Sequence, residues 1–366
     1  PYDGEHTTLA EFFSKRGYVT SGFVGNLVYC TEESGITAGF AHYEDHQIKI
    51  SEFVKSFALG RRLEASQLAH DLFSHYDVFG DKDAAEVTGE FLDWVDDRPS
   101  DRPFFAFLNY MDSHEPYLPP ARFETRFGTG TERNHDLNAY FLRWAARANR
   151  GQMSEEEIAA EVAAYDGTIA YVDEQIGILL EKLRQDNLLE NTVVVVVSDH
   201  GEQFGEHGLH VHGNSLYLPN LHVPLVVYDG GNLPAGLRVA TPVSIRDIPA
   251  TVTSLAGLSA DAPFPGESLE RFWDTADADS VIGAEPVFSE LTDIRGAPTT
   301  KSLVVGRYHY IWGENRIEAL FDLIQDPGEQ TSILTQENRE LVLRMRRLMA
   351  PHVRGDSALW ERLPQN

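Results

Sequence analysis

Carboxylate and histidine side chains gather directly after a run of five valines. Asp199 and His200 follow this run, residues 193–197, and place a carboxylate oxygen beside an imidazole nitrogen. One oxygen donor next to one nitrogen donor is half of a divalent-metal site. Five of the 14 histidines fall in this part of the chain: His200, His207, His210, His212 and His222. We interpret them as one site, although any single histidine of the group could be structural.

Another histidine follows a second apolar run. Residues 103–110, PFFAFLNY, predict a strand, and His114 lies in the turn-rich DSHEPYLPP that comes next, where Pro116 stiffens the chain. Ligands of open α/β sheets bind beyond the carboxyl ends of the strands. His114 is therefore a second candidate, although a lone histidine in a loop is usually structural.

The elements that must position these residues alternate short apolar runs with helical stretches, which is typical of an α/β protein with a mainly parallel sheet. The unbroken valine run predicts a central parallel strand that is buried on both faces. Helices are predicted at 8–16, 61–76, 83–96 and 247–256, and strands at 18–24, 103–110, 193–197 and 222–228.

The clearest helix begins at Ser154, where Glu157 completes a capping box. Apolar residues then recur every three or four positions for about 30 residues, which predicts one buried face. A coiled coil would have this spacing too, but we favour a single helix lying across a sheet. The face comprises Ile158, Val162, Tyr165, Ile169, Val172, Ile176, Leu179 and Leu183.

The pattern changes near residue 281 to short strands and a last helix at 336–349. Strands that are so close in sequence are expected to pair antiparallel. We therefore predict a catalytic domain at 1–280 and a small C-terminal α+β subdomain at 281–366. The strands are PVFSEL, KSLVVG, YHYIW and EALFDL.

Composition excludes several classes of protein. The 366 residues are 42% hydrophobic, enough for a core, and carry a net charge of −27, which disfavours nucleic acid and anionic membranes as partners. Only six of the 30 basic residues are lysines, a composition similar to that of proteins from a high-salt cytoplasm. An ordinary acidic protein is the alternative. The single cysteine excludes an internal disulfide and so favours a cytoplasmic location. No apolar run of the sequence reaches the roughly 20 residues of a membrane span.

Several segments together resemble the sulfatase family of the alkaline phosphatase superfamily. They occur in the family's order over nearly the whole chain: TTLAEFFSKRGYVTSGFVGN, PFFAFLNYMDSHEPYLPP, AYDGTIAYVDEQIGILLEKL, TVVVVVSDHGEQFGEHG with HGNSLYLPNLHVPLVVY, and LFDLIQDPGEQTSIL. The SDHGE to VPLVV block is the most specific, whereas DPGE is supporting only. The resemblance implies a three-layer α/β/α fold with a mainly parallel central sheet.

The resemblance also implies roles for individual residues. Asp199 and His200 are expected to be metal ligands, with Ca²⁺ favoured and Mg²⁺, Mn²⁺ or Zn²⁺ as alternatives. His114 and His212 are expected to contact the substrate; either imidazolium would stabilise developing negative charge, and one of the two would protonate the leaving oxygen. His207 and His222 are expected to support this shell or only to order the loop.

One part of the family pattern is missing. Sulfatases use an acidic metal-binding pair and a formylglycine made from the Cys or Ser of C-x-P/A-S-R, whereas Cys30 stands in YCTEES, a poor candidate for the nucleophile. We therefore expect the sequence to be a fragment whose nucleophile and two metal ligands precede Pro1, and to be inactive as it stands.

The sequence thus predicts a sulfuric ester hydrolase that acts on a small-molecule or carbohydrate sulfate ester. One alternative is a phosphodiesterase, phosphonate monoester hydrolase or phospho-group transferase of the same superfamily. Another is a noncatalytic binding protein that kept the fold. The sequence leaves the oligomeric state open.

Overall fold

The computed structural model describes residues 4–46, 82–128, 153–273, 285–292, 299–314 and 317–353. The chain divides into two compact units, Pro1–Glu190 and Asn191–Asn366, which are described one at a time. The helix predicted at 61–76 lies outside the described residues. The domain boundary predicted at residue 280 stays a prediction.

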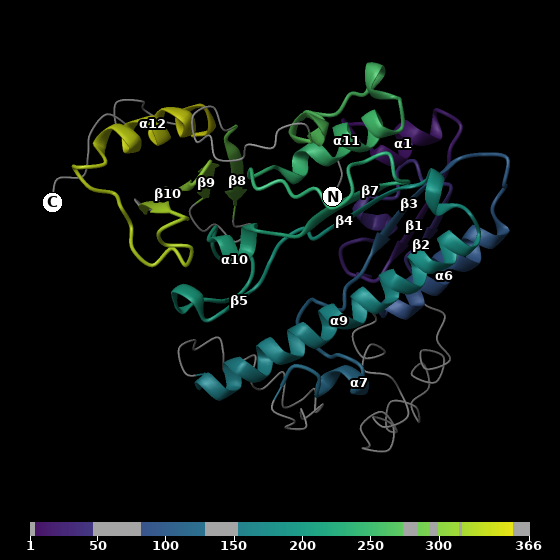
Figure 1. The fold of residues 1–366 in the computed structure, drawn as a ribbon, viewed down its shortest axis with the longest axis horizontal. Helices are drawn as coiled ribbons and strands as arrows, with labels where there is room; N and C mark the ends of the chain where they lie inside the picture. Colours follow the sequence, from purple (N-terminus) through teal and green to yellow (C-terminus); the bar gives the residue numbers. More distant parts are fainter. Residues whose placement is uncertain are drawn as a thin grey trace. The chain divides into compact units, whose positions relative to one another are not determined.

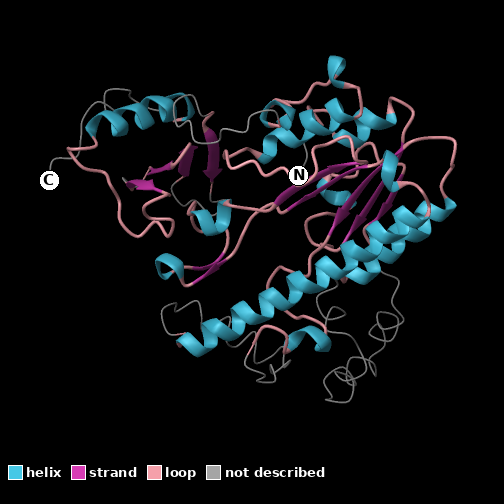
Figure 2. Ribbon diagram, viewed as in Figure 1, coloured by secondary structure: helices cyan, strands magenta, loops and turns pink. Residues whose placement is uncertain are grey.

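A three-stranded parallel sheet is the centre of the first unit (Figures 1 and 2). Its order is β2-β1-β3, and in-register pairing between β1 and β3 runs over six residues of each strand. The predicted parallel sheet is confirmed here. The strands are β1 (Val19–Val24), β2 (His42–Glu44) and β3 (Phe104–Asn109).

Helices cover both faces of this sheet because neighbouring side chains of a strand point to opposite sides. Phe105 stacks on Phe13 of α1 (Leu9–Ser14), with ring centroids 5.0 Å apart. Phe104 instead packs in the apolar cluster that joins the sheet to α6 (Ala84–Asp97) and α9 (Glu155–Gln185). The first unit therefore has the three layers that were expected.

The long helix α9 begins as predicted, but its buried face agrees with the predicted one only at Leu179 and Leu183. Ser154 and Glu157 form the capping box. Ile169, assigned to the core, is 43% exposed. Small residues are buried in its first half instead. A Cβ at Gly167 would already lie 3.1 Å from Pro119 and from the Phe123 carbonyl oxygen in α7 (Ala121–Glu124). The buried residues are Ala163, Ala164, Gly167, Thr168, Tyr171, Gln175, Leu179 and Leu183.

The valine run in the second unit forms β4 (Val193–Val197), which pairs antiparallel with β7 (Leu225–Asp229). The prediction of a parallel strand buried on both faces is wrong for the described residues, since Val197 is 40% exposed. Valine favours the extended backbone but carries no signal for the direction of its partner. The predicted helix after it is α11 (Ile248–Leu255).

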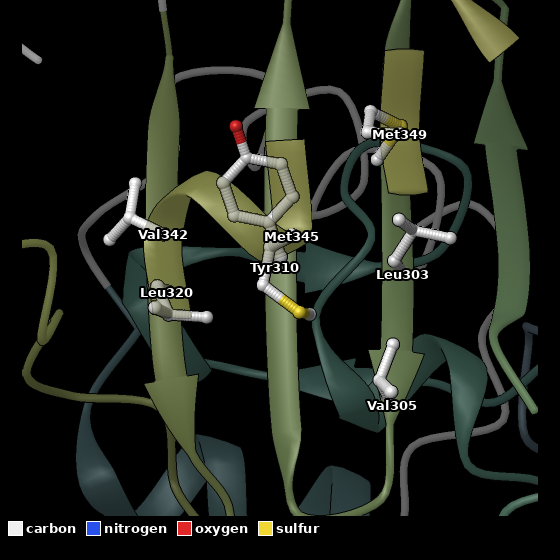
Figure 3. Close-up of a cluster of buried hydrophobic side chains, with 7 residues drawn as sticks. All are labelled: Leu303, Val305, Tyr310, Leu320, Val342, Met345 and Met349. Atoms are coloured by element: carbon white, nitrogen blue, oxygen red, sulfur yellow. The ribbon is translucent and has the colours of Figure 1, made fainter. Parts of the chain in front are cut away.

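The C-terminal part of the second unit is an antiparallel sheet of order β11-β10-β9-β8, as predicted. Helix α12 (Arg339–Met349) packs on it, and Figure 3 shows its residues Val342, Met345 and Met349 among side chains of β9, β10 and β11. Full burial of such side chains contributes about 1.5–3 kcal/mol each. The strands are β8 (Val287–Leu291), β9 (Thr300–Val305), β10 (Tyr308–Gly313) and β11 (Glu318–Asp322).

Candidate functional site

A short hairpin folds the histidine-rich loop back onto the end of β4. Its strands β5 (Gln203–Phe204) and β6 (His210–Val211) pair antiparallel. The return of the chain stacks His212 on His200, with ring centroids 4.1 Å apart and planes 27° apart. Two histidines that are twelve positions apart in sequence therefore share one site.

A close backbone contact fixes the segment that follows His200. The Gly201 N–H donates to the Asn220 carbonyl at 2.9 Å, on α10 (Leu218–Leu221). A Cβ at Gly201 would lie 2.0 Å from the Pro219 carbonyl oxygen, so only glycine fits. Gln203 Oε1 accepts from Asn220 Nδ2 at 3.0 Å and from Ser215 Oγ at 2.9 Å. Residues 199–201, here called the DHG segment, and α10 are thereby held together.

Asp199 and His200 offer two donor atoms that could hold a metal. His200 Nδ1 donates to the Gly201 carbonyl at 2.9 Å, which leaves the lone pair of the neutral ring on Nε2. This Nε2 lies 3.8 Å from Asp199 Oδ2, and the Asp199 carboxylate is 87% exposed. An oxygen and a nitrogen donor therefore face one region. Within the described ranges, no group of three or more His, Cys, Asp or Glu side chains could hold a metal.

A buried carboxylate that the sequence analysis missed orients His212. His212 Nδ1 lies 3.2 Å from both oxygens of Glu202, whose side chain is 4% exposed. A carboxylate on Nδ1 sets the tautomer and stabilises the imidazolium. The one sequence signal for this role was the position of Glu202 directly after the DHG triplet.

Backbone strain concentrates in the same loop. Val211 has φ 60°, which is an outlier for a β-branched residue, and His207 has φ 57°. His207 also stacks on Tyr217, with ring centroids 3.6 Å apart. His222 ends α10, and its N–H donates to the Leu218 carbonyl. Both therefore order the loop in the structure, and a further role for them stays a prediction.

His114 lies in the first unit, in the turn that follows β3. Its Nδ1 donates to the Glu115 carbonyl at 2.7 Å, which again gives Nε2 the lone pair of the neutral ring. The same end of the sheet is closed by Asn109, whose Oδ1 accepts from the Asn26 N–H at 3.0 Å. Asp112 is almost fully buried and accepts from the first amide of α6.

Cys30 follows β1 in the first unit, where its carbonyl accepts from the Tyr43 hydroxyl. Its N–H donates to the Asn26 carbonyl. These two hydrogen bonds hold the Cys30 backbone in the loop after β1.

Two tyrosines on the segments that carry the histidines are held as neutral phenols. Burial raises the pKa of Tyr110 to about 12, despite the opposing hydrogen bond with Thr88. Burial, and then the charge of Glu329, raise the pKa of Tyr217. Neither is suited to act as a phenolate nucleophile near neutral pH.

The model of the Sulfatase family matches residues 3–258, which is more than half of the chain. The chain belongs to the sulfatase family. The family predicted from the sequence motifs is thus confirmed.

Three relatives are identical to this sulfatase chain at about a quarter of the aligned positions. An arylsulfatase of Clostridium perfringens is 27% identical over 74% of this chain and 57% of its own length. A choline-sulfatase of Rhizobium meliloti is 27% identical over 65% of this chain and 47% of its own. Arylsulfatase K of Mus musculus is 26% identical over 91% and 63%. The chain therefore spans only about half to two thirds of the length of these relatives.

Solved structures confirm the predicted alkaline phosphatase-like α/β fold of the sulfatase chain. A phosphonate monoester hydrolase of Agrobacterium radiobacter has a TM-score of 0.72 at 22% identity, and covers 96% of this chain and 82% of its own. A protein solved with its substrate D-glucosamine-2-N,6-O-disulfate has a TM-score of 0.67 at 15% identity over the same shares of the two chains. Among the described helices, none is both long and apolar enough to cross a membrane.

Proposed function

We propose that the complete protein is a metal-dependent sulfuric ester hydrolase, and that the loop after β4 supplies part of its active site. One observation carries the proposal: Asp199, His200 and the Glu202-oriented His212 gather at the end of β4 in a chain of the sulfatase family. Two relatives, an arylsulfatase and a choline-sulfatase, support sulfate esters as the substrate class.

Asp199 and His200 would hold a divalent cation, which we propose to be Ca²⁺ because the Asp199 carboxylate is an oxygen donor and the sulfatase family favours this ion; the His200 nitrogen suits Mg²⁺, Mn²⁺ or Zn²⁺ as alternatives. When bound, the cation polarises a sulfuryl group and neutralises charge on its oxygens. Asp199 offers its exposed carboxylate, and the Gly201 carbonyl holds the His200 ring in the tautomer that ligation needs.

His212 would hold and deliver a proton. Glu202 orients the ring through Nδ1, so Nε2 is the atom that donates to the departing ester oxygen. His114, fixed through Nδ1 by the Glu115 carbonyl, would present Nε2 to the sulfate group. A cation on Asp199 and His200, with an imidazolium at His212, would make the end of β4 locally positive in a protein of net charge −27, which suits an anionic substrate.

The nucleophile is a separate part of the proposal. We propose that it is a formylglycine on a segment of the complete protein that precedes the family match at residue 3. Peptide mass spectrometry of the complete protein tests this directly. A carbohydrate or other small sulfate ester is the proposed substrate, since a structural neighbour was solved with a sulfated glucosamine.

Comparing two chromogenic substrates tests the function. The complete protein, loaded with Ca²⁺, should hydrolyse 4-nitrophenyl sulfate with a higher kcat/KM than 4-nitrophenyl phenylphosphonate. The opposite preference would replace the sulfatase proposal by a phosphonate monoester hydrolase. Activity toward neither class of ester would favour a noncatalytic protein.

A further inference from the structure

A buried glutamate in the C-terminal DPGE motif has an unusual backbone. Glu329 is 2% exposed and has φ 53°, in the left-handed region that favours glycine. A buried carboxylate at a strained position needs compensating contacts, and such strain marks functional sites. The motif supported the family resemblance, but it has no role in the proposed reaction.

Both oxygens of this carboxylate have partners. Oε1 accepts from Nδ1 of His309, a fully buried residue of β10. Oε2 accepts from the Leu218 N–H at 2.7 Å, at the first residue of α10. Glu329 therefore connects the C-terminal sheet to α10 across more than a hundred residues of sequence.

Two contacts continue this connection toward the metal-ligand pair. Asn220, in the same four-residue helix as Leu218, accepts through its carbonyl from the Gly201 N–H, directly after His200. Tyr217, just before the helix, stacks on His207, and its ring centroid lies 6.1 Å from that of Phe321 on β11. A displacement of α10 would therefore reach the DHG segment.

We propose that Glu329, held by His309, is a positioning residue that fixes α10 and, through it, Gly201 and the proposed metal ligands Asp199 and His200. The proposal deepens the proposed function and rests on it. The carboxylate bonds to His309 of β10 and to the Leu218 N–H, and acts on the proposed metal ligands only through α10. The C-terminal sheet thereby takes part in the geometry of the active site.

Backbone and side-chain roles of Glu329 can be separated by the choice of variant. Glu329→Gly removes the carboxylate together with the strain of a side chain at positive φ. Glu329→Gln keeps that strain and keeps an oxygen that can accept from the Leu218 N–H. Gln330→Ala is the matched control, because Gln330 is exposed and bonds only to the Gly328 carbonyl among the contacts found for it. Each variant is made in the complete protein.

Two measurements follow these variants. Hydrogen exchange reports the protection of residues 199–222, and calorimetric titration of the metal-stripped protein with Ca²⁺ reports affinity. Glu329→Gly should speed exchange in 199–222 by about tenfold or more and weaken Ca²⁺ binding about tenfold, while β9 and β10 keep their protection. Glu329→Gln should recover part of both losses, and Gln330→Ala should match wild type.

Three results would overturn the proposal. These are wild-type behaviour of Glu329→Gly, an equal loss of protection in β9 and β10, and no recovery in Glu329→Gln. If wild-type protein binds no Ca²⁺ and hydrolyses no sulfate ester, the proposed function fails, whereas hydrogen exchange still decides whether Glu329 positions α10.

Discussion

Replacing Gly201 with alanine should distort the proposed metal site without removing any functional group. The new Cβ would lie 2.0 Å from the Pro219 carbonyl oxygen, and that atom is backbone, which cannot swing aside. Relief requires a shift of roughly 1 Å and stretches the hydrogen bond from Gly201 to Asn220. Overpacking costs about 1–3 kcal/mol and the weakened hydrogen bond about 1 kcal/mol, so the expected loss of stability is about 2–4 kcal/mol.

The functional loss should exceed what the stability loss explains. A misplacement of about 1 Å at a reacting group can lower a rate about 100-fold. We therefore expect kcat/KM for 4-nitrophenyl sulfate to fall about 100-fold under conditions where urea titration shows the variant to be folded.

Gly177→Ala provides the matched control. Gly177 lies within α9, where a new Cβ would meet no atom within 4 Å, so the same change should stabilise the protein by about 1 kcal/mol and leave kcat/KM unchanged. Wild-type stability and activity in Gly201→Ala would refute the close approach of the DHG segment to α10, and with it the account of how His200 is held.

Three further changes test other parts of the structure. Glu202→Gln should lower kcat about 10- to 100-fold with little change in KM, because His212 loses its orienting carboxylate; steady-state kinetics measures this. Arg346→Met should lower the free energy of urea unfolding by about 3 kcal/mol, because it removes the bidentate partner of the Glu318 carboxylate on β11. Burial alone would raise the pKa of Asp322, but hydrogen bonds from Arg307 and two backbone amides outweigh burial and lower this pKa below its usual value of 3.8. The free energy of unfolding should therefore decrease as the pH is lowered through and below 3.8. The stabilisation is present above this pH and is lost as the carboxylate is protonated, so Arg307→Gln should flatten the acid limb of the stability profile.

Local signals predicted much of the fold. The Ser154 capping box fixes where α9 begins, since its partners lie within one turn of each other. The short, closely spaced C-terminal strands fold antiparallel as expected. Partner choice over long distances was less accessible. The valine run pairs antiparallel with β7, and α9 buries Gly167 where Pro119 comes close, rather than the predicted Ile169.

The candidate site was predictable in its residue types and less so in its supports. Asp199, His200 and His212 were found from their crowding after one strand, and the structure brings them together. Glu202 and Glu329 act through contacts that no spacing rule describes, and those of Glu329 span 20 and 111 positions. The calcium preference, the origin in a high-salt cytoplasm and the cytoplasmic location stay predictions.

The central claim is that Asp199 and His200 hold the metal of a sulfatase active site. The most direct measurement is the Ca²⁺ content of the complete protein and of its Asp199→Asn variant, determined together with 4-nitrophenyl sulfate hydrolysis. We predict that the variant loses both bound Ca²⁺ and activity while its urea unfolding stays close to that of wild type, since the carboxylate is largely exposed. Full metal occupancy with unchanged hydrolysis in Asp199→Asn would contradict the account.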